Sequence, residues 1–283
     1  MEGGRLNGHR LKVMKAAAVQ IAVGVSLEDN LDRAATLIDE AVAQGARFIA
    51  LPECFTGKYG VSLFASHRER VPCAAAEGEP PRTGAALLAQ RARQHGVFIT
   101  GGVIEEDEDG TLYNSMPTFG PDGSLISTYR KVHLSRVMGI TSESDVLTPG
   151  DQTVTIDVGM TVGMACCFDL RFPTFLAQYG PRVAHPAHII CAPSAFLDLT
   201  GKEHWDLLIR RTALDGQCFV VAPDIAFDPS DATPLHGRTA IVDPFGKILA
   251  QCAPEGDGLA VAEVSCERVE EVRKNLPLTL WAQ

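Results

Sequence analysis

Residues 159–173 read GMTVGMACCFDLRFP, and the rest of the chain can be arranged around them. Residues 162–166 form an apolar run of strand length, and Pro173 opens the next apolar segment. Proline suits the first turn of a helix, where its missing N–H is not needed. The stretch therefore predicts a strand, an elbow at Cys167 and a helix that begins at Pro173. Such an elbow exposes a nucleophile beside backbone N–H groups that can hold an oxyanion.

Two other stretches end apolar, strand-like runs with a charged residue: LPECF with Glu53, and YRKVHL with Lys131. A carboxylate, an ammonium and a thiol at strand ends form a plausible acyl-transfer constellation. Each has an ordinary alternative, since Cys167 could be a small core residue. Glu53 could be a loop carboxylate and Lys131 half of a surface basic pair with Arg130. Their joint occurrence favours catalysis.

These three motifs, in this order, resemble the nitrilase superfamily of carbon–nitrogen hydrolases over nearly the whole chain. The resemblance implies that Cys167 forms a thioester with an amide substrate, without a metal or organic cofactor. Glu53 would carry protons, and Lys131 with the N–H near Phe168 would stabilise the oxyanion. The family normally has a glutamate after the proline of CFDLRFP, where this chain has Thr174.

The resemblance also implies a second glutamate at Glu143, in ESDVLTPG, which orients Lys131 or the substrate. From the residues alone, Glu143 is a solvated loop carboxylate. Adjacent strand residues face opposite ways, so only one of the neighbouring cysteines can enter the pocket. The CFDLRFP motif selects Cys167, and Cys166 is then expected in the core.

Composition limits the other function classes. The net charge of −10 argues against nucleic-acid or anionic-membrane partners, and no apolar run is long enough to span a bilayer. Without a secretory h-region, we expect a disordered tail at 1–12 and one domain at 13–283. The eight cysteines form no C-x-x-C pair, which predicts reduced thiols in a cytoplasmic setting and no zinc site.

Apolar periodicity and turn residues predict alternating strands and helices. The expected helices are 31–42, 83–95, 173–179, 204–214 and 269–275. The expected strands are 15–20, 47–51, 98–103, 111–119, 125–130, 153–158, 162–166, 188–191, 219–222, 237–242, 247–251 and 259–264. Segment 180–188 is either a shortened helix end or a longer connection. This α/β pattern fits two mixed sheets packed face to face with helices outside, which is the four-layer α-β-β-α sandwich of the nitrilase superfamily.

Several local strings, among them GGVIEEDEDGTLYNS, TFGPDGSL and LTGKEHWDLL, resemble the omega-amidase branch. That branch hydrolyses the terminal amide of 2-oxoglutaramate and 2-oxosuccinamate. The branch that acts on deaminated glutathione shares many of these strings, and N-carbamoyl amine hydrolases and nitrilases are more distant options. A catalytically dead interaction module is the non-enzymatic alternative, which the intact Glu53, Lys131 and Cys167 disfavour.

An omega-amidase must hold the carboxylate of a small amide substrate, and an unpaired charge in a pocket is costly. The acidic chain cannot steer an anion by its overall charge, so recognition must be local. Candidates are Lys58 and Tyr59 after Glu53, Arg171 after Cys167, and Thr200. Arg171 could instead pair with a nearby carboxylate, and Lys58 could face solvent. The family resemblance also implies a homodimer, which would use the apolar end at 280–283.

Overall fold

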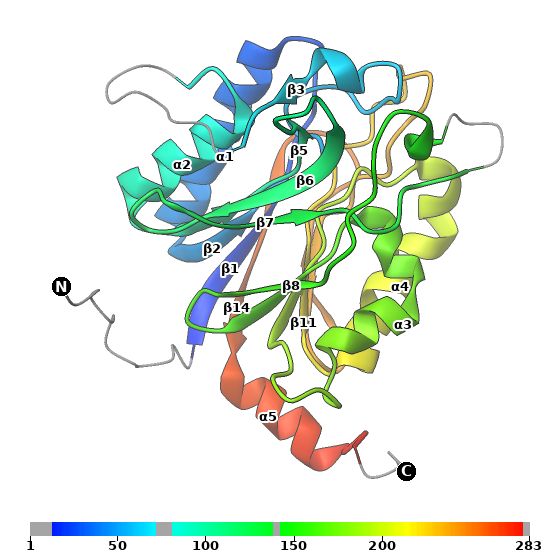
Figure 1. The fold of residues 1–283 in the computed structure, drawn as a ribbon. Helices are drawn as coiled ribbons and strands as arrows, with labels where there is room; N and C mark the ends of the chain where they lie inside the picture. Colours follow the sequence, from blue (N-terminus) through cyan, green and yellow to red (C-terminus); the bar gives the residue numbers. More distant parts are fainter. Residues whose placement is uncertain (1–12, 72–80, 138–141, 280–283) are drawn as a thin grey trace.

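Two mixed β-sheets pack face to face in this computed structural model, which describes residues 13–71, 81–137 and 142–279 (Figure 1). The first sheet has the order β14 (Gly258–Ser265), β1 (Val13–Gln20), β2 (Ala46–Ala50), β4 (Phe98–Thr100), β6 (Leu112–Phe119), β5 (Val103–Glu106) and β3 (Arg68–Glu69), with β7 (Leu125–Arg130) paired to β6. The second has the order β13 (Ile248–Gln251), β12 (Ala240–Val242), β11 (Phe219–Ala222), β10 (Ile189–Cys191), β9 (Thr161–Met164) and β8 (Val154–Asp157). The expected tail 1–12 and the apolar end 280–283 lie outside the described residues.

Helices cover the outer face of each sheet, as expected for an α-β-β-α sandwich. The first sheet carries α1 (Leu27–Ala43) and α2 (Gly84–His95), and the second carries α3 (Pro173–Leu176) and α4 (Asp198–Gly216) (Figure 1). The last helix, α5 (Cys266–Asn275), follows β14. Gly96 ends α2 in the left-handed conformation that glycine favours, with φ 63°. Within the described ranges, no helix combines the length and apolarity that a membrane crossing needs.

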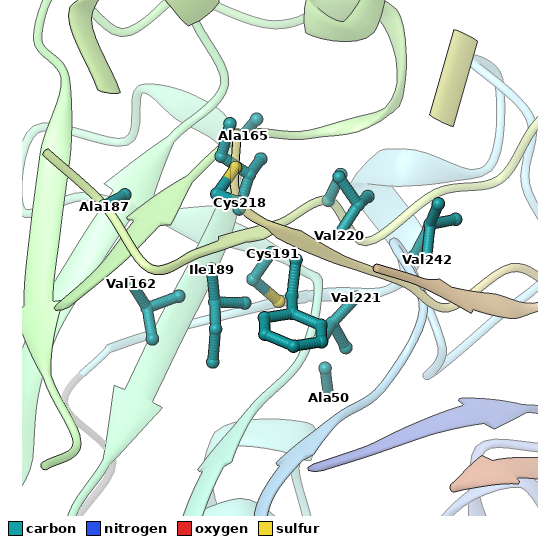
Figure 2. Packing of buried hydrophobic residues seen from close by; sticks show 14 of the residues in the cluster. Ala50, Val162, Ala165, Ala187, Ile189, Cys191, Cys218, Val220, Val221 and Val242 are labelled. Carbon is teal, nitrogen blue, oxygen red and sulfur yellow. The ribbon is translucent and has the colours of Figure 1, made fainter. Parts of the chain in front are cut away.

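Alternation along the strands fills two apolar layers. Ala16 and Ala18 of β1 face the core between the sheets, while Ala17 and Val19 face the layer beneath α1 and α2. Successive strand side chains point to opposite faces, so a strand buried on both sides needs apolar residues at every position. In Figure 2, Val221 of β11 points toward Ala50 of the opposite sheet, and its neighbour Val220 points the other way.

The expected strand 98–103 is divided into β4 and β5 at Gly101 and Gly102. A Cβ atom on Gly102 would lie 2.4 Å from the Cα of Glu53, so no side chain fits there. The Gly102 N–H donates to the Pro52 carbonyl at 2.9 Å, and the Gly102 carbonyl accepts from Phe55 N–H at 3.2 Å. The break therefore holds the loop after β2, and with it Glu53, against the neighbouring strand.

In the second half, two elements begin at other residues than expected, and the open alternative for 180–188 is decided. The helix α4 begins at Asp198 rather than at 204. It therefore includes Gly201, which packs closely against His236, since a Cβ at Gly201 would lie 2.3 Å from the His236 ring. The helical turns after Pro173 end with η4 (Ala177–Tyr179), and residues 181–188 form a connection without helix or strand. The strand expected from 237 begins at Ala240.

Candidate active site

Glu53 lies just beyond β2 and is completely buried among hydrogen-bond donors. Its Oε1 accepts from Asn114 Nδ2 at 2.6 Å, Lys131 Nζ at 2.7 Å and Cys166 Sγ at 3.2 Å. Its Oε2 accepts from the Ala195 N–H at 2.7 Å. A carboxylate is an acceptor on both oxygens, so the donors around it suit the ionised group.

Lys131, directly after β7, is buried between two carboxylates. Its Nζ lies 2.7 Å from Glu53 Oε1 and 2.9 Å from Glu143 Oε2. Burial by itself lowers the pKa of Lys131, but the charges of Glu143 and Glu53 outweigh it and raise that pKa well above its ordinary value. An ammonium has three N–H donors, so one remains for a further acceptor. The surface-pair alternative is wrong, because Arg130 pairs separately with Glu105 and Asp107.

Glu143 is also fully buried, which excludes the solvated-loop alternative. It opens the short 3-10 helix η2 (Glu143–Asp145). Its Oε2 accepts from the Ser135 N–H as well as from Lys131, and its Oε1 accepts from Asn114 Nδ2 at 3.2 Å. Glu143 therefore holds Lys131 on the side opposite Glu53.

Cys167 occupies the expected elbow. It follows β9, has φ 43° and opens the 3-10 helix η3 (Cys167–Arg171), which leads into α3 at Pro173. The Cys167 N–H donates to the Pro193 carbonyl at 3.0 Å. Burial raises the pKa of the Cys167 thiol well above its ordinary value, the charge of Glu53 adds to this, and Lys131 opposes it. The resting thiol is therefore protonated and needs a base to become a nucleophile.

Cys166 is fully buried in the core, as expected. Its thiol also donates to Glu53 Oε1 at 3.2 Å. The strand β9 ends at Met164, before the two cysteines, so strand alternation is not what separates their side chains. Of the two, Cys167 lines a cavity with about 290 Å³ of empty space, part of it open to solvent.

Two buried polar residues at the site were not predicted. Asn114 on β6 donates to both Glu53 and Glu143, and its carbonyl accepts the Lys131 N–H at 2.8 Å. Asp169, inside CFDLRFP, accepts from the Cys166 N–H at 2.8 Å, Tyr129 Oη at 2.6 Å and the His133 N–H at 3.0 Å. An amide inside an apolar strand and an aspartate two residues after the thiol were the signals that could have found them.

Arg171 is half-buried in the cavity wall and contacts no carboxylate of the described residues. Its guanidinium donates to Thr200 Oγ1 at 3.2 Å and lies 3.1 Å from His204 Nδ1. Its Cζ lies 5.6 Å from the Phe168 ring centroid and 5.1 Å from that of Phe196. No described residue forms an ion pair with it, so the alternative of a structural carboxylate partner is not seen within those ranges. Burial lowers the pKa of Arg171, but a guanidinium remains charged at neutral pH.

The other candidate substrate contacts separate into two groups. Tyr59 and Thr200 line the cavity with Cys167, and Tyr59 Oη lies 3.1 Å from Ser135 Oγ. Burial raises the pKa of Tyr59 well above its ordinary value, so it presents a neutral hydroxyl. Lys58 is not on the cavity wall: its Nζ pairs with Asp231 and lies 3.6 Å from Asp228.

Six of the described cysteines, Cys54, Cys166, Cys167, Cys191, Cys218 and Cys252, are free thiols. Among the described residues, no three His, Cys, Asp or Glu side chains are grouped so as to hold a metal ion.

Comparisons with known proteins show what the chain as a whole is similar to. A family model described as carbon-nitrogen hydrolase matches residues 15–274. The chain is 36% identical to "Omega-amidase NIT2-A" of Xenopus laevis and 33% identical to "Omega-amidase NIT2" of Homo sapiens, each alignment covering 93% of both chains. Saccharomyces cerevisiae Nit3, described as a member of branch 10 of the nitrilase superfamily, superposes with a TM-score of 0.82 at 32% identity, covering 95% of this chain and 96% of that one.

Proposed function

The chain belongs to the carbon-nitrogen hydrolase family, and from this premise we propose that it is an omega-amidase. It would hydrolyse the terminal carboxamide of a short 2-oxo acid, such as 2-oxoglutaramate, to the carboxylate and ammonia. Glu53, Lys131 and Cys167 would form its catalytic triad, with Glu143 holding the lysine.

The first half-reaction transfers the acyl group to Cys167. Glu53 takes the thiol proton, and the thiolate attacks the amide carbonyl carbon. The free N–H of Lys131 and the N–H of Phe168 stabilise the oxyanion; the latter lies in the first turn of η3, where N–H groups have no partner within the helix. The carbon–nitrogen bond then breaks, ammonia leaves with the proton that Glu53 carried, and a thioester remains.

The second half-reaction returns the enzyme to its resting state. Glu53 removes a proton from water, which attacks the thioester carbonyl. The tetrahedral intermediate expels the Cys167 thiolate, which takes the proton back from Glu53, and the carboxylic acid leaves. In the resting site two carboxylates hold Lys131, and Glu143 keeps its charge while Glu53 carries protons, which supports a fixed ammonium rather than a proton carrier.

One observation carries the choice of an anionic substrate: a half-buried guanidinium, Arg171, in the wall of the Cys167 cavity without a carboxylate partner among the described residues. An unpaired buried charge is costly, and a ligand carboxylate would offset that cost. Thr200 and Tyr59 offer neutral hydrogen-bonding groups on the same wall.

The test is ammonia release from a panel of amides. We expect kcat/KM for open-chain 2-oxoglutaramate to exceed that for a neutral amide of similar length by about a hundredfold, roughly 2.7 kcal/mol. Faster turnover of deaminated glutathione would move the protein to that branch. If an N-carbamoyl amine exceeds both, only the family assignment stands, and if nothing is turned over, the chain is a catalytically inactive member.

Two variants test the anion site. Arg171→Met should lower kcat/KM for 2-oxoglutaramate by about ten- to a hundredfold, because one charge-assisted contact is lost, and should change that for the neutral amide by less than about threefold. Lys58→Met is the matched control, since its ammonium is already paired with aspartates. Equal losses in the two variants would contradict the assignment of Arg171.

A further inference from the structure

Asp224 is a buried carboxyl group beside the site that the proposed mechanism does not use. It follows β11 and is completely buried. Its Oδ1 accepts the N–H groups of Phe196 and Ile225, both at 2.9 Å. Its Oδ2 has no hydrogen-bond partner among the described residues, and none of their cations pairs with it. A buried acid with so little compensation requires an explanation.

The Phe196 contact connects Asp224 to the site. Ala195, the preceding residue, donates its N–H to Glu53 Oε2 at 2.7 Å. Two buried carboxyl groups therefore hold consecutive N–H groups of one segment, Glu53 that of Ala195 and Asp224 that of Phe196. In the same stretch, the backbone of Ser194 forms an isolated parallel β-bridge with Asp224.

The surroundings favour a neutral Asp224. Burial raises its pKa well above the ordinary value, the two N–H bonds oppose this, and the charge of Glu53 raises it further. A protonated carboxyl still accepts both N–H bonds through its carbonyl oxygen.

We propose that Asp224 is a positioning residue for the hydrolytic site: by holding the Phe196 N–H, it fixes the 194–197 segment so that the Ala195 N–H meets Glu53. The inference rests on the proposed function for its catalytic meaning. The contact between Asp224 and the segment does not depend on which amide is the substrate. Asp224 acts through Ala195 and Glu53 and does not touch the reacting atoms.

The experiment compares Asp224→Ala with Asp224→Asn, measuring kcat, KM, the rate of Cys167 alkylation by iodoacetamide and thermal unfolding. Peptide mass spectrometry separates Cys167 from the other thiols. Asp224→Ala should displace the charge-assisted hydrogen bond from the Ala195 N–H to Glu53. We therefore expect kcat and the alkylation rate to fall about tenfold, with KM within about threefold. Asp224→Asn keeps a neutral acceptor in the same place, so both rates should stay within about twofold of wild type.

Asp243→Ala is the matched control. Asp243 is also a buried aspartate whose carboxyl accepts two backbone N–H groups, from Phe245 and Lys247. It differs from Asp224 in pairing with Arg268 at 3.0 Å and in lying in the turn between β12 and β13. The substitution should lower the unfolding temperature without changing kcat or alkylation.

Unchanged rates in a destabilised Asp224→Ala variant would overturn the inference, leaving Asp224 a structural residue. An Asp224→Asn variant with impaired kcat and alkylation rates would also overturn the inference. This second variant tests the inference even if the alanine variant does not fold. If wild type hydrolyses none of the amides, the proposed function fails, while the alkylation rates still test the role of Asp224.

Discussion

Replacing Lys131 with methionine should reveal how much stability the buried charge cluster depends on. Lys131 is completely buried and lies within 2.9 Å of both Glu53 and Glu143. Methionine fills a similar volume but leaves two carboxylates facing one space without a cation. Removing one partner of a buried ion pair typically costs about 3–5 kcal/mol, a large part of a total stability of about 5–15 kcal/mol. If Lys131 were instead an exposed oxyanion donor, its removal would not carry this cost in stability.

The loss of stability in Lys131→Met should depend on pH. In Lys131→Met, the crowded carboxyl groups bind a proton in the folded state at a pH where the unfolded chain has released it. The folded state then binds more protons than the unfolded state, so the stability of the variant falls as pH rises. The difference in unfolding free energy between the variant and wild type should therefore become smaller as the pH is lowered from about 8 to about 5.5, toward the ordinary pKa range of carboxyl groups.

Urea unfolding followed by the fluorescence of buried Trp205 measures these free energies. Lys202→Met is the control: its ammonium also pairs with a carboxylate, that of Asp198, but its side chain is 67% exposed, so the change should stay within about 1 kcal/mol. Adding Glu143→Gln to Lys131→Met should recover about 1–3 kcal/mol by removing one of the opposed charges. A gap below about 1 kcal/mol, or one that does not vary with pH, would refute this account of the cluster.

Three further predictions concern individual groups. Cys167→Ala should abolish ammonia release, whereas Cys166→Ala should lose at most about tenfold, because its thiol supplies one of several donors to Glu53; substrate-protected alkylation of Cys166 instead would reverse the assignment. Glu53→Gln should show no burst of ammonia, since neither thiolate formation nor deacylation has a base; a stoichiometric burst would direct attention to Glu143. Burial raises the pKa of Glu69 to about 7, although the N–H groups at the start of α2 donate to its carboxylate and oppose this rise. The folded state therefore keeps a proton that the unfolded state releases, and wild-type stability should fall by about 3 kcal/mol as pH rises from its ordinary carboxyl range to about 7. Urea unfolding of Glu69→Gln should lack this part of the fall, and an equal pH dependence in the two proteins would argue against it.

Local patterns in the sequence determined the elements and their ends. Apolar periodicity located α1 and α2, and Gly96 marked where α2 ends because the left-handed conformation there suits glycine. The Pro121-Asp122-Gly123 turn joined β6 to β7, which placed Lys131 at the end of a hairpin. These features depend on a few neighbouring residues, so the sequence alone was enough to predict them.

The tertiary structure decided which side chains surround the reactive groups. The donors to Glu53 come from β6, the end of β7, the elbow after β9 and the segment after β10, and strand order and register bring them together. Periodicity tells which face a side chain occupies, not which residue of another sheet lies opposite it. For that reason the partners of Lys58, the contacts of Arg171 with Thr200 and His204, the thiol contact of Cys166 and the position of Asp224 emerged only from the packing of the two sheets.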